Sequence, residues 1–146
     1  MATEAQDWLS NLIHDFVLTS PLNSLRREPD EKAWDEPLVG FSSGTDLLYK
    51  DFKDAVGEDH WTPFEAFSIK FPDIVVRPED LTVISWILPH RKATKDDNSK
   101  ENFYPSLRWV QARFPGEEFN NSLRRHVVEE MNKKGILSVA PLHMPE

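Results

Sequence analysis

The segment 81–88 constrains the fold of this chain more than any other, because it is short, almost entirely apolar and rich in β-branched residues, and Pro89 ends it. Such a run is typical of a strand that is covered on both faces. A second core strand is predicted at residues 136–140, with helical segments between the two. A strand, a helical crossover and another strand imply parallel, right-handed pairing. The sequence therefore predicts an α+β fold, close to α/β, with a small mixed sheet flanked by helices.

The part before this segment, residues 1–79, is predicted to be mostly helical. Apolar residues that repeat at i, i+3 and i+4 predict a first helix, which Pro21 ends. Thr62 and Glu65 form a capping-box pattern at the start of a further helix. Between these two, a helix that ends at Gly57 is predicted to direct its apolar side chains inward. Those side chains are Leu47, Leu48, Phe52 and Val56.

Residues 80–146 are predicted to form a strand–helices–strand unit. Residues 90–103 are charged and have no apolar period, so we expect a long polar loop there. Two helices follow at 105–113 and 117–134, and Gly135 is a natural residue to end the second. The second helix directs four apolar residues inward. They are Phe119, Leu123, Val127 and Met131.

Length, charge and cysteine content narrow the classes of protein to consider. A chain of 146 residues has the size of one domain, so we predict a single domain over 1–146. A formal net charge of −8 disfavours a nucleic-acid binder. No apolar run approaches the ~20 residues of a membrane-spanning helix, and no secretory signal is evident, so a cytoplasmic location is expected. The absence of cysteine leaves no thiolate ligand for zinc or for an iron–sulfur cluster.

No standard catalytic signature occurs in the chain, so no catalytic residue and no metal ligand is predicted. His126 has Ser122 and Glu130 nearby on its helix, which suits a solvated side chain better than a ligand contact. Three arginines lie near the turn around Pro115 and the following helix start, where an anion could bind. They are Arg113, Arg124 and Arg125. Glu117 at that start would oppose the anion. A last cluster, more typical of a solvated face than of a cation site, is Asp51, Asp54, Glu58 and Asp59.

A series of short motifs runs along nearly the whole chain. The motifs are Asp35-Glu36-Pro37-Leu38-Val39-Gly40-Phe41, Thr62-Pro63-x-Glu65-Ala66, Asp80-Leu81-x-Val83-Ile84-x-Trp86-x-Leu88-Pro89, Tyr104-Pro105-Ser106-x-Arg108-Trp109, Phe119-Asn120, Leu123-Arg124-Arg125-His126-Val127-Val128 and Val139-Ala140-Pro141. Together they resemble the N-terminal region of epoxyqueuosine-reductase-like iron–sulfur proteins, in an anaerobe-type branch. Their common order makes the resemblance more specific than any single motif.

The resemblance implies a cobalamin-binding domain with a nitroreductase-like core, followed in the family by a ferredoxin-type domain whose cysteines hold [4Fe–4S] clusters. It also implies a cofactor or partner surface in this chain. The residues of that surface would be Arg113, Asn120, Arg124 and His126. Other residues replace the Tyr and His that contact the corrinoid in the queuosine enzymes. The family's catalytic acid and cluster cysteines lie beyond the equivalent of Pro141, so the chain is not expected to be active alone.

Two interpretations of function therefore stand side by side. In the first, the chain is the N-terminal, cofactor-free part of an iron–sulfur and corrinoid-type reductase, and it acts only with a missing or separately encoded cysteine-rich half. In the second, it is a non-enzymatic interaction module derived from that family, with an incomplete sheet that docks another chain. Under either interpretation an uncovered apolar face predicts a homo-oligomer or a cysteine-rich iron–sulfur partner.

Overall fold

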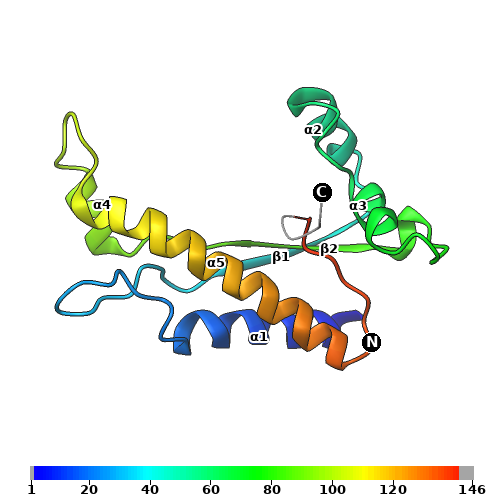
Figure 1. Cartoon of the computed structure of the whole chain (residues 1–146), viewed down its shortest axis with the longest axis horizontal. Helices are drawn as coiled ribbons and strands as arrows, with labels where there is room; N and C mark the ends of the chain where they lie inside the picture. The colour runs from blue at the N-terminus through cyan, green and yellow to red at the C-terminus, as the bar shows by residue number, and fades with distance from the viewer. Residues whose placement is uncertain (1, 142–146) are drawn as a thin grey trace. The chain divides into compact units, whose positions relative to one another are not determined.

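The structure, a computed structural model, describes residues 2–141, with side chains described from Glu4 onward. Five α-helices, one short 3-10 helix and a two-stranded antiparallel sheet occur in this part of the chain. This architecture confirms the predicted α+β class. In chain order the elements are α1 (Ala2–Thr19), β1 (Leu38–Ser43), α2 (Leu48–Val56), α3 (Pro63–Lys70), η1 (Pro78–Asp80), β2 (Thr82–Ile87), α4 (Lys92–Asn98) and α5 (Leu107–Lys133) (Figure 1).

The chain divides into two compact units. Unit 1 combines Met1–Val39 with Trp86–Val127, and unit 2 combines Gly40–Ser85 with Val128–Glu146. Both strands and α5 begin in one unit and end in the other. Each unit is described separately below.

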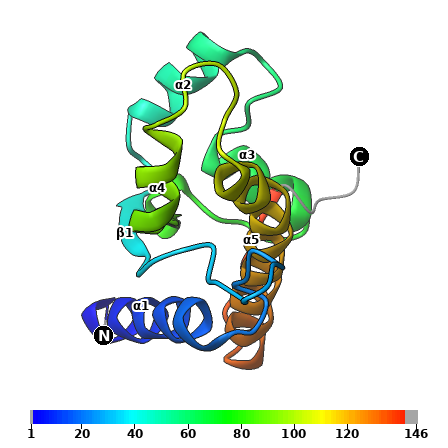
Figure 2. The same ribbon diagram turned by 90° about the vertical axis from the view of Figure 1, so that its left-hand side faces the viewer.

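Unit 1 has a core made by α1 and α5. Ile13 and Val17 of α1 and Leu123 of α5 are fully buried, and Phe119 is 1% exposed. The ring of Phe16 lies 5.6 Å from that of Phe119, and the two helices lie next to each other in both views (Figures 1 and 2). Each such side chain contributes about 1.5–3 kcal/mol when it leaves water. The apolar stripe of the first predicted helix therefore packs against the predicted stripe of α5.

Asn23 fixes the chain that follows α1. Its side chain is 3% exposed, and all four of its hydrogen-bonding positions are used. The amide nitrogen donates to the carbonyl oxygens of Val17 (2.9 Å) and Trp34 (3.1 Å). The amide oxygen accepts from the backbone N–H groups of Ala33 (3.1 Å) and Trp34 (2.9 Å). One side chain therefore joins the end of α1 to the segment before β1.

The sheet differs from the predicted one. β2 lies where a strand is predicted, but it pairs with β1 in antiparallel fashion, and residues 136–140 form no strand. The prediction of parallel pairing with 136–140 is therefore wrong. The prediction that 81–88 is covered on both faces is also wrong, because Thr82 and Ser85 are exposed and Ile87 is 63% exposed. An apolar run specifies a strand, yet it does not specify which segment supplies its partner or its cover.

Two predictions about the segment after β2 are also corrected. Residues 90–103 contain the short helix α4, in which Thr94 is 1% exposed. α5 is one helix with Pro115 inside it, so the predicted break between two helices is wrong. Local rules give Pro115 its usual role as a helix breaker. Here the packing of the flanking residues on α1 and on Trp34 keeps the helix continuous.

The end of α5 forms as predicted. Gly135 has a φ of 73°, the left-handed conformation that glycine adopts without strain. Its N–H donates to the carbonyl of Asn132 (2.9 Å), and the N–H of Ile136 donates to that of Met131 (3.0 Å). This pair of bonds is a Schellman motif, and it satisfies carbonyl groups that the helix leaves open.

Unit 2 contains few buried side chains. In α3 the capping box is confirmed, since Thr62 accepts from the backbone N–H of Glu65 and the Glu65 carboxylate accepts from that of Thr62. Ala66 and Phe67 of α3 are buried. α2 forms where a helix is predicted, but none of its residues is buried. The prediction that its apolar side chains face inward is therefore wrong, and their arrangement is taken up below.

Candidate functional site

Three of the four residues predicted to form a cofactor or partner surface lie along one face of α5. Spacings of seven and four residues, at about 100° per residue, place Arg113, Asn120 and Arg124 on that face, and they place His126 on another. At a rise of about 1.5 Å per residue, Arg113 and Arg124 are some 16 Å apart along the helix. The fourth residue, His126, stacks on Phe16 of α1 with ring centroids 4.6 Å apart. The four side chains therefore do not converge on one point.

Two of the three side chains on this face, Asn120 and Arg124, already contact other side chains of the chain. The Asn120 side-chain oxygen accepts a hydrogen bond from the indole N–H of Trp86 (3.0 Å). Arg124 donates to the side-chain oxygen of Asn121 (2.7 Å) and contacts the carboxylate of Glu117 (3.3 Å). The Arg113 side chain is exposed and forms no hydrogen bond or ion pair with the residues that the structure describes. These residues offer a corrinoid no shared set of donors, and the chain has no cysteine for an iron–sulfur cluster.

The anion site that the sequence left open, but did not favour, at a helix start near Glu117 does not form. α5 is continuous through this region, so its backbone N–H groups here are inside the helix and not at its N-terminus. Across the described residues, no group of three or more acidic or His side chains is placed to hold a metal ion, and this includes the cluster around Asp51. No helix in this part of the chain is both long and apolar enough to cross a membrane.

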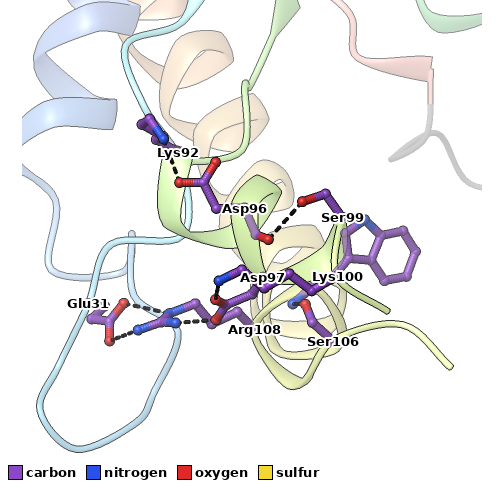
Figure 3. A network of polar contacts seen from close by, with 9 residues as sticks. Glu31, Lys92, Asp96, Asp97, Ser99, Lys100, Ser106 and Arg108 are labelled. Carbon is purple, nitrogen blue, oxygen red and sulfur yellow. Dashed lines mark hydrogen bonds and ion pairs between the residues drawn. The ribbon is translucent and has the colours of Figure 1, made fainter. Parts of the chain in front are cut away.

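A network of charged side chains is centred on Arg108, near the start of α5 (Figure 3). Its guanidinium group donates to both oxygens of the Glu31 carboxylate, at 3.0 and 3.1 Å. It also donates to the carboxylate of Asp97 in α4. Lys100 contacts the second Asp97 oxygen at 3.6 Å, and Arg27 contacts Glu31 at 3.7 Å. One planar cation thus links the segment before β1 to α4 and α5.

The charge balance of this centre explains its stability. The hydrogen bonds from Arg108 lower the pKa of Glu31 and the pKa of Asp97 below their usual values. In return, the bonds to Glu31 and then to Asp97 raise the pKa of Arg108. Both carboxylates are therefore ionised at neutral pH, and the guanidinium group has both sides occupied. This arrangement suits a structural clamp better than an anion-binding site.

A second cluster joins Trp34, His90 and Trp109. Trp34 and His90 form an isolated antiparallel bridge, and their rings lie 4.7 Å apart. The rings of His90 and Trp109 lie 6.3 Å apart. Burial, with a smaller contribution from Lys95, lowers the pKa of His90, so its imidazole is neutral at pH 7. A Cβ at Gly116 would come within 2.3 Å of the Trp34 ring, which explains why glycine occupies this position in α5.

Two buried nitrogens in this cluster have no hydrogen-bond partner among the described residues: the indole nitrogen of Trp34 and Nδ1 of His90. Unpaired buried donors cost free energy, so such groups are either tolerated strain or points of contact for a further group. Sequence reasoning missed this cluster, because Trp34 and His90 lie far apart in the chain and carry no motif. A His directly after the Pro that ends a strand was the one available signal.

Comparisons with known proteins add no relative. No protein-family model, no curated protein and no solved structure matches this chain. The resemblance to epoxyqueuosine-reductase-like proteins therefore stands on the sequence motifs alone.

Proposed function

We propose that this chain is the cofactor-free part of an iron–sulfur reductase, and that it acts only together with a cysteine-rich part that carries the clusters. The order of the sequence motifs supports the family, and the lack of cysteine means that the clusters would be held elsewhere. The resemblance also implies a corrinoid as a second cofactor of the complete reductase. Reduction of a substrate would then require the complete assembly.

One observation carries the need for a partner. The sheet has two strands in the described part of the chain, and large apolar residues on both strands remain in water: Leu38 is 62% and Ile87 is 63% exposed. A two-stranded sheet is marginal without a further strand or layer to cover it. Exposed apolar surface of this kind is typical of a surface that another polypeptide covers.

The second candidate function is an interaction module without redox chemistry. The same exposed strands favour it, since cover by a partner does not require that the partner contain metal. The contacts of Arg108 also favour it, because each nitrogen of its guanidinium group already donates to a carboxylate of the chain itself. The two candidates differ in what the partner contains.

Anaerobic purification of the tagged full chain from its source cells distinguishes them. Iron, acid-labile sulfide and cobalt are measured in the purified complex and in the chain expressed alone. The reductase proposal predicts a colourless chain alone, and a complex with stoichiometric iron and sulfide. A stable complex that contains neither would support the interaction module instead. A chain that stays monomeric at high concentration, binds no apolar dye and recovers no partner would contradict both.

A further inference from the structure

Helix α2 keeps its apolar residues in water. Leu48 is 53% exposed, Phe52 46% and Val56 72%, and Leu47, just before the helix, is 79% exposed. The three helical residues repeat at i, i+4 and i+8, which places them on one face at about 100° per residue. An apolar stripe of three successive turns is the pattern by which an amphipathic helix binds a groove.

Polar contacts hold α2 in its own unit and leave this stripe outside. The hydroxyl of Tyr49 lies 2.6 Å from that of Ser42 in β1, and the ammonium of Lys53 lies 2.5 Å from the carboxylate of Glu65 in α3. Tyr49 and Lys53 are four residues apart, so they share a face beside the apolar stripe. Both views place α2 at the outer end of unit 2 (Figures 1 and 2). The stripe is therefore accessible without any change in the unit.

The charges around α2 define what can cover the stripe. Two lysines occur between residues 46 and 59, and both are paired within the unit: Lys50 with Asp54 (3.2 Å) and Lys53 with Glu65. The remaining acidic side chains of this stretch have no such lysine. They are Asp46, Asp51, Glu58 and Asp59. This surplus of negative charge would repel an anionic membrane and the α2 of a second copy, and it would attract a basic surface.

We propose that α2 is a docking helix that places Leu48, Phe52 and Val56 in an apolar groove of a partner protein. Lys or Arg side chains on the rim of that groove would face Asp51 and the acidic residues just after the helix, Glu58 and Asp59. Apolar burial supplies the affinity, and the charges select the partner and its orientation. The inference does not depend on the iron–sulfur assignment, because it specifies the shape and charge of a groove and not its metal content.

Photo-crosslinking locates the contact. The full chain carries p-benzoylphenylalanine at position 52 in the source cells, and a matched chain carries it at position 103. Phe103 is 85% exposed but lies in unit 1, so it controls for unspecific capture. We expect one protein adduct at position 52 that is absent at position 103. That protein is then identified by mass spectrometry and purified, and its affinity for the full chain is measured.

Matched substitutions test both parts of the groove contact. Phe52→Ser is expected to raise Kd at least about tenfold, whereas Phe103→Ser leaves Kd unchanged. Asp51→Asn and Asp54→Asn each remove one negative charge, but Asp54 is already paired with Lys50. We expect Asp51→Asn to weaken binding roughly threefold at low salt and Asp54→Asn to have little effect. Because no residue of α2 is buried, all these α2 variants should melt with the parent chain.

Four outcomes overturn the proposal. The first is an adduct between two copies of this chain, and the second is no adduct beyond that at position 103. The third is a Kd that Phe52→Ser leaves unchanged. The fourth is binding of the parent chain, but not of Phe52→Ser, to phosphatidylcholine–phosphatidylserine vesicles. None of these results depends on the iron and sulfide content of any complex, so they are distinguishable from a failure of the proposed reductase function.

Discussion

The two units use similar apolar residues in different ways. In unit 1, apolar side chains from α1 and α5 pack against one another, and Ile13, Val17 and Leu123 are fully buried. In the described part of unit 2, the buried apolar residues are Ala66, Phe67 and Met131, while helix α2 has none. Amphipathic patterning thus predicts helices with inward-facing apolar side chains in both units, and the helices form in both, but α2 does not bury its apolar side chains. The difference indicates that unit 1 supplies its own core and that unit 2 depends on what covers it.

The largest expected effect is on the free energy of unfolding, and it differs between matched Leu→Ala substitutions in the two units. Leu123→Ala empties a fully buried position of α5, so it should lower the free energy of unfolding by about 2–5 kcal/mol. The matched change Leu48→Ala in α2 removes the same atoms from a side chain that is 53% exposed, and it should change stability by less than about 0.5 kcal/mol. Urea unfolding measures both. Equal losses would mean that α2 is packed and that the contrast between units does not exist.

Asn23 provides the next effect, within unit 1. Asn23→Ala leaves buried backbone groups of Val17, Ala33 and Trp34 without their partner, so a loss of about 2–3 kcal/mol is expected. Asn11, which is exposed on α1, is the control position for the same substitution. A loss at Asn23 no larger than that at Asn11 would show that the segment after α1 is not held through this amide.

Gly116 tests the packing of α5 on Trp34. A methyl group there would approach the Trp34 ring to 2.3 Å, so Gly116→Ala should cost about 1–3 kcal/mol despite the better helix propensity of alanine. A methyl group on Gly40 in β1 would meet no atom within 4 Å, and Gly40→Ala should be nearly neutral. Thermal melts of the two variants give the comparison. A stabilised Gly116→Ala would indicate that Trp34 lies elsewhere.

Acid should affect the two units over different pH ranges. Burial lowers the pKa of His90 in unit 1, so the unfolded chain binds more protons at this residue than the folded chain does. The contribution of neutral His90 to the free energy of unfolding is therefore present above about pH 6.5, and it is lost as pH falls through the folded-state pKa. In unit 2, hydrogen bonds from Lys53 and Thr62 lower the pKa of Glu65 to about 2, so its contribution is lost only as pH falls from about 4.5 toward 2.

Unfolding measured between pH 7 and pH 3 separates these contributions. His90→Gln should remove the loss in the range near pH 6, and Glu65→Gln should leave that range unchanged. A parent chain with constant stability from pH 7 to pH 5 would contradict the lowered pKa of His90.

Short sequence signals correctly predict the helix ends that depend only on neighbouring residues. The capping box at Thr62 and the glycine that ends α5 form as expected, because each depends on a few neighbouring residues. The pairing of strands could not be predicted in this way. β2 pairs with β1, whereas 136–140 has a similar apolar pattern and forms no strand. Pattern and length do not decide between two such candidates, since pairing depends on the rest of the fold.

The candidate sites also depend on how the chain folds, and not on short sequence signals. Arg108 binds Glu31 and Asp97, and Asn23 joins α1 to Trp34, so each centre consists of residues from different segments of the chain. No spacing rule connects them. The residues proposed from the family motifs do fall on α5, but side-chain partners such as Trp86 for Asn120 become visible only in the folded chain. Position along a helix was predictable, and engagement of the side chain was not.

Amide hydrogen exchange of the full chain, resolved by residue, tests the contrast between the units most directly. We predict strong protection in α1 and in residues 107–127 of α5, and protection close to that of an open chain in α2, with α3 in between. Addition of the groove-bearing partner should then slow exchange in α2 and leave α1 unchanged. Protection in α2 equal to that in α1 for the chain alone would contradict the account, because it would show that unit 2 has a core of its own.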